Sequence, residues 1–210
     1  MTPVPRLVVV TDWRLPPDVL LRALDRALEA GPDVAVQHRH PDAPTRQFLD
    51  EARQLASLCQ ARGNPLFVNG RLDVALRVGA HLHLPASGPL PRDVRPHLPP
   101  GRLVSMAVHD AREARDATGA DLALVSPVFP PGSKPGDTRE TLGPEGFLAV
   151  ARQLACPALA LGGITPERAR GLQGAAGFAV ISAVLEAESP TRVARSLLMA
   201  APPSAMLRAL

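Results

Sequence analysis

Short apolar runs alternate along this chain with longer segments in which apolar and polar residues are mixed. Eight of the runs have the length of buried β-strands and are apolar at consecutive positions. They predict strands over Leu7 to Val10, Val34 to Gln37, Leu66 to Val68, Leu82 to Leu84, Leu103 to Val108, Leu122 to Val125, Ala158 to Leu161 and Phe178 to Ile181. Strands that are apolar on both faces are typical of a parallel sheet covered by helices.

The segments between the runs carry apolar residues at helical spacing and begin with helix start signals. They predict helices over Pro16 to Ala30, Pro44 to Arg62, Arg71 to Val78, Pro89 to His97, Asp110 to Thr118, Gly143 to Leu154 and Pro166 to Leu172, and a final helix over Pro190 to Ala200. No GxGxxG pattern follows the first strand, as a Rossmann fold would require. We therefore expect one domain over residues 1–210, a single (β/α)8 TIM barrel. Residues 203–210 form a tail that docks either on the barrel or on a second subunit.

Composition narrows the classes of partner. The formal charge is +3, and arginines alternate with carboxylates at helical spacing, which predicts solvated helix faces and no nucleic-acid binding. The first residues do not resemble a signal peptide and no apolar run has the length of a membrane span, so we expect a cytoplasmic protein without a membrane partner. The two cysteines, Cys59 and Cys156, have no metal-ligand spacing and are predicted as free thiols in apolar surroundings. Assembly as a homo-oligomer stays open.

In a barrel of this kind, working residues lie at the carboxyl ends of the strands and in the loops that follow. After the seventh predicted strand come Gly162 and Gly163, and after the eighth come Ile181 and Ser182. Glycines let a ligand approach the backbone, and free amides at the start of a helix attract anions. These two turns predict a phosphate site. Alternatively, the glycine pair is only a tight turn and Ser182 an ordinary N-cap.

The longest connection follows the sixth strand and is rich in proline and glycine, as substrate lids often are. It contains Ser133 and Lys134, the single lysine of the chain. We predict that both contribute to phosphate binding when the lid closes, against the alternative of a solvated loop lysine.

Alternation along the second strand places Gln37 and Arg39 on one face and His38 on the other. If Gln37 faces inward, Arg39 points into the mouth of the barrel, where its guanidinium can hold a carboxylate or phosphate with two hydrogen bonds. Otherwise Arg39 pairs with a neighbouring acid. His40, at the end of the strand, is a candidate proton carrier or a solvated loop histidine.

Three polar residues lie at or near the ends of the next strands. Asn69 follows the third strand and either binds a ligand or caps the following helix. His83 lies within an apolar run, which favours a buried core histidine. His109 has the strand parity of Ala107 and is the better candidate for an acid or base. No group of residues predicts a metal site or a resident cofactor from spacing alone.

Several short motifs occur in order along these strands: Thr11-Asp12, Gln37-x-Arg39, Asn69-Gly70-Arg71, Pro127-Val128-Phe129-Pro130, Leu161-Gly162-Gly163-Ile164 and Val180-Ile181-Ser182-Ala183. Over essentially the whole chain, the sequence resembles the thiamine phosphate synthase and TenI superfamily. The resemblance implies a (β/α)8 barrel whose small ligand is a phosphorylated thiazole.

The synthases of that superfamily join a pyrimidine diphosphate to a thiazole phosphate and use magnesium, so the resemblance implies Mg²⁺ only if this chain is a synthase. Here Gly70 replaces the first magnesium aspartate of the family, and residues 85–88 contain no carboxylate for the second. Pro41, Ala107 and Pro131 replace the family's lysine, serine and first lid threonine.

The Asn69-Gly70-Arg71 and Leu84-Pro85-Ala86-Ser87-Gly88 segments resemble the TenI branch, whose members tautomerise a thiazole carboxylate phosphate without a metal. We therefore expect a thiazole tautomerase, an isomerase in which His109 or His40 moves the proton, although the histidine of that branch is replaced at Ser126-Pro127. The alternatives are a thiamine phosphate synthase and a non-catalytic protein that binds a phosphorylated ligand.

Overall fold

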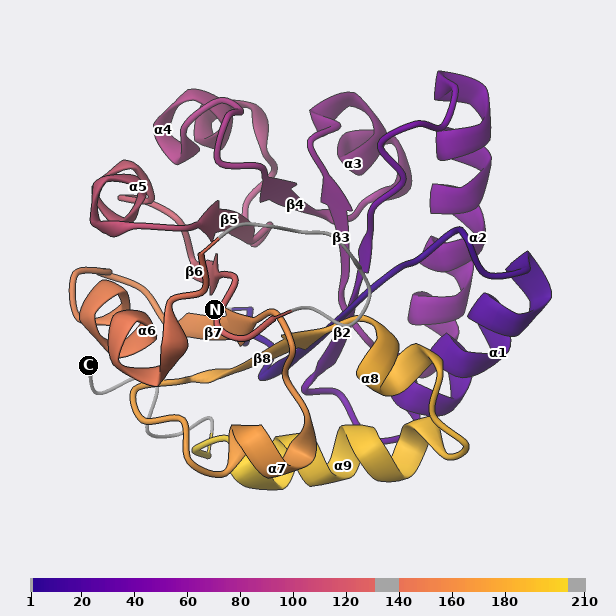
Figure 1. The fold of residues 1–210 in the computed structure, drawn as a ribbon. Helices are drawn as coiled ribbons and strands as arrows, with labels where there is room; N and C mark the ends of the chain where they lie inside the picture. The colour runs from indigo at the N-terminus through magenta and orange to yellow at the C-terminus, as the bar shows by residue number, and fades with distance from the viewer. Residues whose placement is uncertain (1, 131–139, 204–210) are drawn as a thin grey trace.

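The computed structural model describes residues 2–130 and 140–203, in which strands and helices alternate around a closed barrel (Figure 1). Each strand pairs in parallel with the next, and β1 also pairs with β8. The strands are β1 (Leu7–Val10), β2 (Val34–His38), β3 (Leu66–Asn69), β4 (His81–Leu84), β5 (Val104–Val108), β6 (Leu122–Val125), β7 (Ala158–Leu161) and β8 (Gly177–Val180). The predicted (β/α)8 barrel is confirmed.

The helices surround the strands (Figure 1). They are α1 (Pro17–Leu28), α2 (Thr45–Arg62), α3 (Leu72–Val78), α4 (Pro91–Val94) with a 3-10 turn over Arg95–His97, α5 (Ala111–Asp116), α6 (Gly143–Ala151), α7 (Pro166–Ala169), α8 (Ser182–Leu185) and α9 (Pro190–Ala200). The helix predicted over Pro89 to His97 is wrong in part. Its α-helical portion ends at Val94, because Pro96 lacks the backbone N–H that would continue the ladder.

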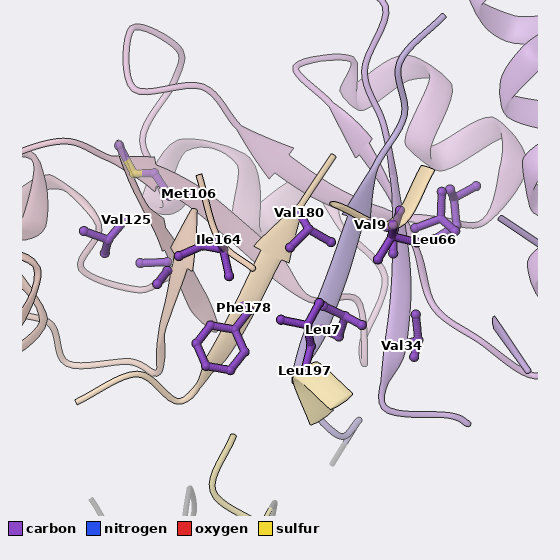
Figure 2. Packing of buried hydrophobic residues seen from close by; sticks show 14 of the residues in the cluster. Leu7, Val9, Val34, Leu66, Met106, Val125, Ile164, Phe178, Val180 and Leu197 are labelled. Carbon is purple, nitrogen blue, oxygen red and sulfur yellow. The ribbon is translucent and has the colours of Figure 1, made fainter. Parts of the chain in front are cut away.

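The strands have an inner and an outer apolar face. In β1, Leu7 and Val9 pack in the larger cluster beneath the helices, whereas Val8 and Val10 belong to a smaller cluster inside the barrel. Figure 2 shows the outer face, where Leu7 lies beside Leu197 of α9. Since successive side chains of a strand point to opposite faces, this parity decides which residues reach the mouth.

Arg6 joins the two ends of the described chain. Its Nη2 donates to the carbonyl oxygens of Leu198 (2.6 Å) and Ala201 (2.8 Å) at the end of α9. Its Nη1 donates to Asp33 Oδ2 (3.1 Å), just before β2. The last helix is therefore tied to the residue that precedes the first strand.

Both cysteines are free thiols, as the sequence predicts. Burial raises the pKa of Cys59 and of Cys156 to about 12, so both are protonated at neutral pH. Among the described residues, no helix is long and apolar enough to cross a membrane.

Candidate active site

A cavity of about 540 Å³ opens at the carboxyl ends of the strands. Its deeper wall is apolar and includes Val10, Leu124 and Leu161. The structure brings the following predicted site residues to it: Gln37, Arg39, Asn69, His109 and Ile181. The cavity is within the size range of small-molecule sites and lies where barrel enzymes hold their ligands.

Strand parity in β2 places Gln37 and Arg39 in the cavity and His38 on the opposite face. His38 is fully buried against Phe48, and its Nδ1 accepts a hydrogen bond from Trp13 Nε1 (3.2 Å). Burial lowers the pKa of His38 to about 4. His38 is thus a neutral structural histidine, whereas Gln37 and Arg39, which directly follows β2, face the mouth.

Gln37 is 3% exposed, yet within the described part of the chain its Oε1 accepts no hydrogen bond. A buried carbonyl oxygen without a donor costs about 1–3 kcal/mol. Because Gln37 lines the cavity, an N–H or O–H of a bound ligand would satisfy it.

His109 and Glu113 form a hydrogen-bonded pair at the rim of the cavity. Glu113 Oε2 accepts from the backbone N of His109 (2.7 Å) and lies 2.7 Å from its Nδ1. A carboxylate at Nδ1 favours a proton on that nitrogen and leaves Nε2 for a ligand. Both residues line the cavity, so the pair has the geometry of an oriented acid or base.

His40 does not join that pair. Its Nδ1 lies 2.9 Å from Glu51 Oε2, and its ring stacks on Trp13 with centroids 5.7 Å apart. It lines an adjoining hollow of about 350 Å³, which shares Arg39 and Ile181 with the main cavity. The two candidates for proton transfer therefore lie in different hollows: His109 lines the main cavity and His40 lines the adjoining one.

His83 combines two features that the sequence analysis treated as alternatives. It is buried, with Nδ1 2.8 Å from Ser105 Oγ, as a core histidine would be. Its ring also lines the cavity. Burial, with a smaller contribution from the positive charge of Arg39, lowers the pKa of His83 to about 3. His83 therefore contributes a neutral imidazole to the wall.

Asn69 ends β3 and faces the cavity. The alternative role as a helix cap is not observed, because the N-cap residue of α3 is Arg71 and no side chain caps that helix. Asn69 therefore keeps its amide available for a ligand.

The turns after β7 and β8 lie at the same end of the barrel, since Leu161 is in register with Ala179. Gly162 and Gly163 have φ values of +99° and +59°. A Cβ at Gly163 would lie 2.5 Å from the carbonyl oxygen of Pro130, so this glycine is required by packing against the loop after β6. Packing against the loop after β6 therefore explains why a glycine is needed at position 163, whether or not a ligand binds at this turn.

Ser182 is the first residue of α8, and the N-cap position belongs to Ile181. The alternative of an ordinary serine N-cap is therefore wrong. Ser133 and Lys134 of the predicted lid lie outside the described residues.

Arg112 projects from α5 into the cavity wall and is a site residue that the sequence pattern did not predict. Arg112 occurs among the mixed charges that we assigned to a solvated helix face. The helix start explains its position: Asp110 Oδ1 accepts from the backbone N of Arg112 and of Glu113, each at 2.8 Å. This cap starts α5 directly after His109 and aims its first turn at the mouth.

We expect Asp110→Ala to destabilise the protein by about 1 kcal/mol at pH 7. The hydrogen bond from the Glu113 amide, the largest cause, holds the pKa of Asp110 below its ordinary 3.8 in the folded state. The stabilisation is therefore complete above pH 3.8 and is lost as the pH falls through the lower, folded pKa. Urea unfolding at pH 7 and near pH 3 should show the difference between wild type and variant shrinking. Asp110→Asn, which keeps an acceptor, is the control, and an equal loss in that variant would contradict the capping role.

A (β/α)8 barrel with a cavity at the carboxyl ends of its strands, and with turns after β7 and β8 at the same end, has the architecture of the class of barrel proteins that bind phosphorylated small molecules. Within that class, residues 7–184 match the sequence model of the family described as "Thiamine monophosphate synthase". The chain belongs to this family.

Relatives similar over most of the chain carry the same name. The thiamine-phosphate synthase of Chloroflexus aurantiacus is 37% identical over 91% of this chain and 90% of its own. That of Chlorobium luteolum is 38% identical over 92% of each chain. The solved structure of thiamine phosphate pyrophosphorylase from Pyrococcus furiosus is similar with a TM-score of 0.78 and 32% identity, covering 93% of this chain and 94% of that one.

These similarities correct the expected activity. A thiazole tautomerase, an isomerase of the TenI branch, is the activity expected from the segments at residues 69–71 and 84–88, and that expectation is wrong. The named relatives are thiamine-phosphate synthases over about nine-tenths of the chain, which favours a transferase. Two short segments were too local a feature to outweigh similarity over the whole barrel.

The residues at the expected magnesium positions do not fit a hard divalent cation. Gly70 carries no side chain, and Pro85, Ala86 and Ser87 line the cavity without a carboxylate. Magnesium prefers carboxylate and water oxygens in octahedral geometry. Among the described residues, no group of three or more histidines, cysteines, aspartates or glutamates could hold a metal ion.

Proposed function

We propose that this protein is a thiamine-phosphate synthase, a transferase that joins a pyrimidine diphosphate to a thiazole phosphate. The observation that carries the proposal is the similarity of the whole chain to named synthases. It is supported by a cavity of about 540 Å³ at the carboxyl ends of the strands, where barrel enzymes hold their ligands. A cavity of this size has room for two small ring systems.

In the proposed reaction, a bond forms between the thiazole nitrogen and the methylene carbon of the pyrimidine. The bond from that carbon to the diphosphate oxygen breaks, and the diphosphate leaves with the electron pair. Negative charge therefore develops on the leaving group, and cationic donors placed around it lower the barrier. The guanidinium groups at the cavity are the described cations suited to this role.

The turns at Gly162, Gly163, Ile181 and Ser182 are proposed to hold the thiazole phosphate. The first turn of α8 presents backbone N–H groups, and Ile181 reaches the cavity wall. Ser133 and Lys134 are proposed to close over a phosphate. The Gln37 amide oxygen is proposed to accept a hydrogen bond from a substrate ring substituent, which fits its lack of a partner among the described residues.

His109 is proposed to accept a hydrogen bond through Nε2 from a substrate N–H or O–H, since its Nδ1 proton is donated to Glu113. Asn69 is proposed to donate through its amide. His40 is proposed to act only through the adjoining hollow, where Glu51 orients it.

Incubating the purified protein with both substrates and detecting thiamine phosphate by mass spectrometry tests the proposed activity. Arg39→Ala should reduce the rate of product formation by roughly 10–100-fold, because it removes charge-assisted hydrogen bonds. Arg53→Ala is the control: Arg53 is exposed on α2 and paired with Asp50. Absence of product from the wild type would overturn the proposal, and equal rates in the two variants would overturn the role of Arg39.

A further inference from the structure

We propose that this protein binds the diphosphate group with two arginines, Arg39 and Arg112, in place of a divalent cation. The inference rests on the proposed transferase function and concerns the same cavity. It starts from the disagreement between the magnesium positions of the family and the residues of this chain.

The neighbour of Gly70 is an apolar ring. A Cβ built on Gly70 would be in ordinary van der Waals contact with Pro85, 3.8 Å from its Cδ and 3.9 Å from its Cγ. Gly70 also has φ of +68°, and its amide donates to the carbonyl oxygen of His83 (2.8 Å). An apolar ring replaces the oxygen ligand that the family places here.

The two carboxylates that do line the cavity, Glu113 and Asp116, are poorly placed for a cation. Glu113 Oε2 already accepts from the backbone of His109 and contacts its ring. Asp116 follows Arg112 by four residues, so the two lie on the same face of α5. A divalent cation at Asp116 would have a guanidinium as its neighbour.

Arg39 and Arg112 approach the cavity from different elements, the end of β2 and the first turn of α5. Neither forms an ion pair with another described residue. The positive charge of Arg39 is felt inside the cavity, where it adds to the effect of burial in lowering the pKa of His83. A guanidinium presents a planar fork that matches two phosphate oxygens, so two arginines can clamp a diphosphate.

Arg112 is the second residue of α5, where the helix dipole disfavours a cation by about 0.3–1 kcal/mol. The capping carboxylate of Asp110 offsets that cost, and the charge of Arg112 adds to the hydrogen bond from the Glu113 amide in lowering the pKa of Asp110. Arg115, in the last turn of the same helix, offers a matched cation away from the helix start.

Calorimetric titration of the full-length protein with inorganic pyrophosphate, in EDTA and in excess Mg²⁺, tests the inference. We expect binding in EDTA, with an affinity that Mg²⁺ changes less than about threefold. Arg112→Ala and Arg39→Ala should each weaken it by roughly 10–100-fold. Arg115→Ala, the matched control on α5, should leave it unchanged. Arg112→Ala should unfold within about 2 °C of wild type, which separates lost binding from lost folding.

Pyrophosphate binding that requires Mg²⁺, no binding in either buffer, or wild-type affinity in Arg112→Ala would each overturn the inference. Failure of this inference can be distinguished from failure of the proposed function by comparing the titration with the activity assay. A protein that forms thiamine phosphate only with Mg²⁺ would retain the proposed function and lose this inference. A protein that binds pyrophosphate in EDTA but forms no product would retain this inference and lose the proposed function.

Discussion

Gly177→Ala should lower the stability of the barrel by about 3 kcal/mol or more. A Cβ at Gly177 would lie 2.1 Å from the carbonyl oxygen of Arg6 and 2.8 Å from its carbonyl carbon. These are backbone atoms at the junction of β8 and β1, where Phe178 N donates to the same Arg6 oxygen (2.9 Å). The clash can be relieved only by moving a strand, because no flexible side chain is involved.

For a chain of this length, that loss corresponds to a fall of roughly 6–12 °C in the melting temperature. Gly171→Ala is the matched control. Gly171 is exposed, and a Cβ there would meet no atom within 4 Å, so its stability should change by less than about 0.5 kcal/mol. Thermal unfolding followed by circular dichroism measures both. Equal melting temperatures would mean that β8 does not lie this close to Arg6.

Ser182→Asp should weaken binding of the thiazole phosphate by about 100-fold or more. It places a carboxylate at the first residue of α8, where the proposed phosphate accepts backbone hydrogen bonds, and like charges in contact cost several kcal/mol. Fold stability should not fall, because an acidic residue suits a helix start. Calorimetric titration with the thiazole phosphate measures the affinity.

Ser189→Asp provides the comparison for that experiment. Ser189 is the N-cap residue of α9, and its side chain makes no capping hydrogen bond. The same change of charge at this helix start should leave ligand affinity unchanged. If Ser182→Asp binds as tightly as Ser189→Asp, the phosphate does not sit at α8.

Much of the barrel could be predicted from local patterns. The apolar runs locate all eight strands to within about two residues, because strands covered on both faces leave a strong signal. Parity along β2 and β5 places Arg39 and His109 at the mouth, where the structure has them. Helix ends were less predictable, as the break at Pro96 shows.

The features of the site that the sequence did not predict depend on contacts between residues that are far apart along the chain. Glu51 on α2 holds His40 away from the main cavity, and nothing near position 40 encodes that contact. His83 was assigned to the core because its neighbours are apolar, although His81 and His83 have the same parity and together indicate the interior of the barrel. A cation at the start of a helix was the available signal for Arg112.

The hydrogen bonds between Arg6 and the end of α9 have a consequence for how the chain folds during its synthesis. On the ribosome, the first strand emerges long before residues 177–201, yet the edge of β1 that pairs with β8 and the Nη2 group of Arg6 find their partners only there. The earlier strands can pair in sequence order, but the ring stays open until nearly the whole chain is made. A nascent chain stopped before Gly177 is expected to expose the edge of β1, and with it a surface that chaperones recognise.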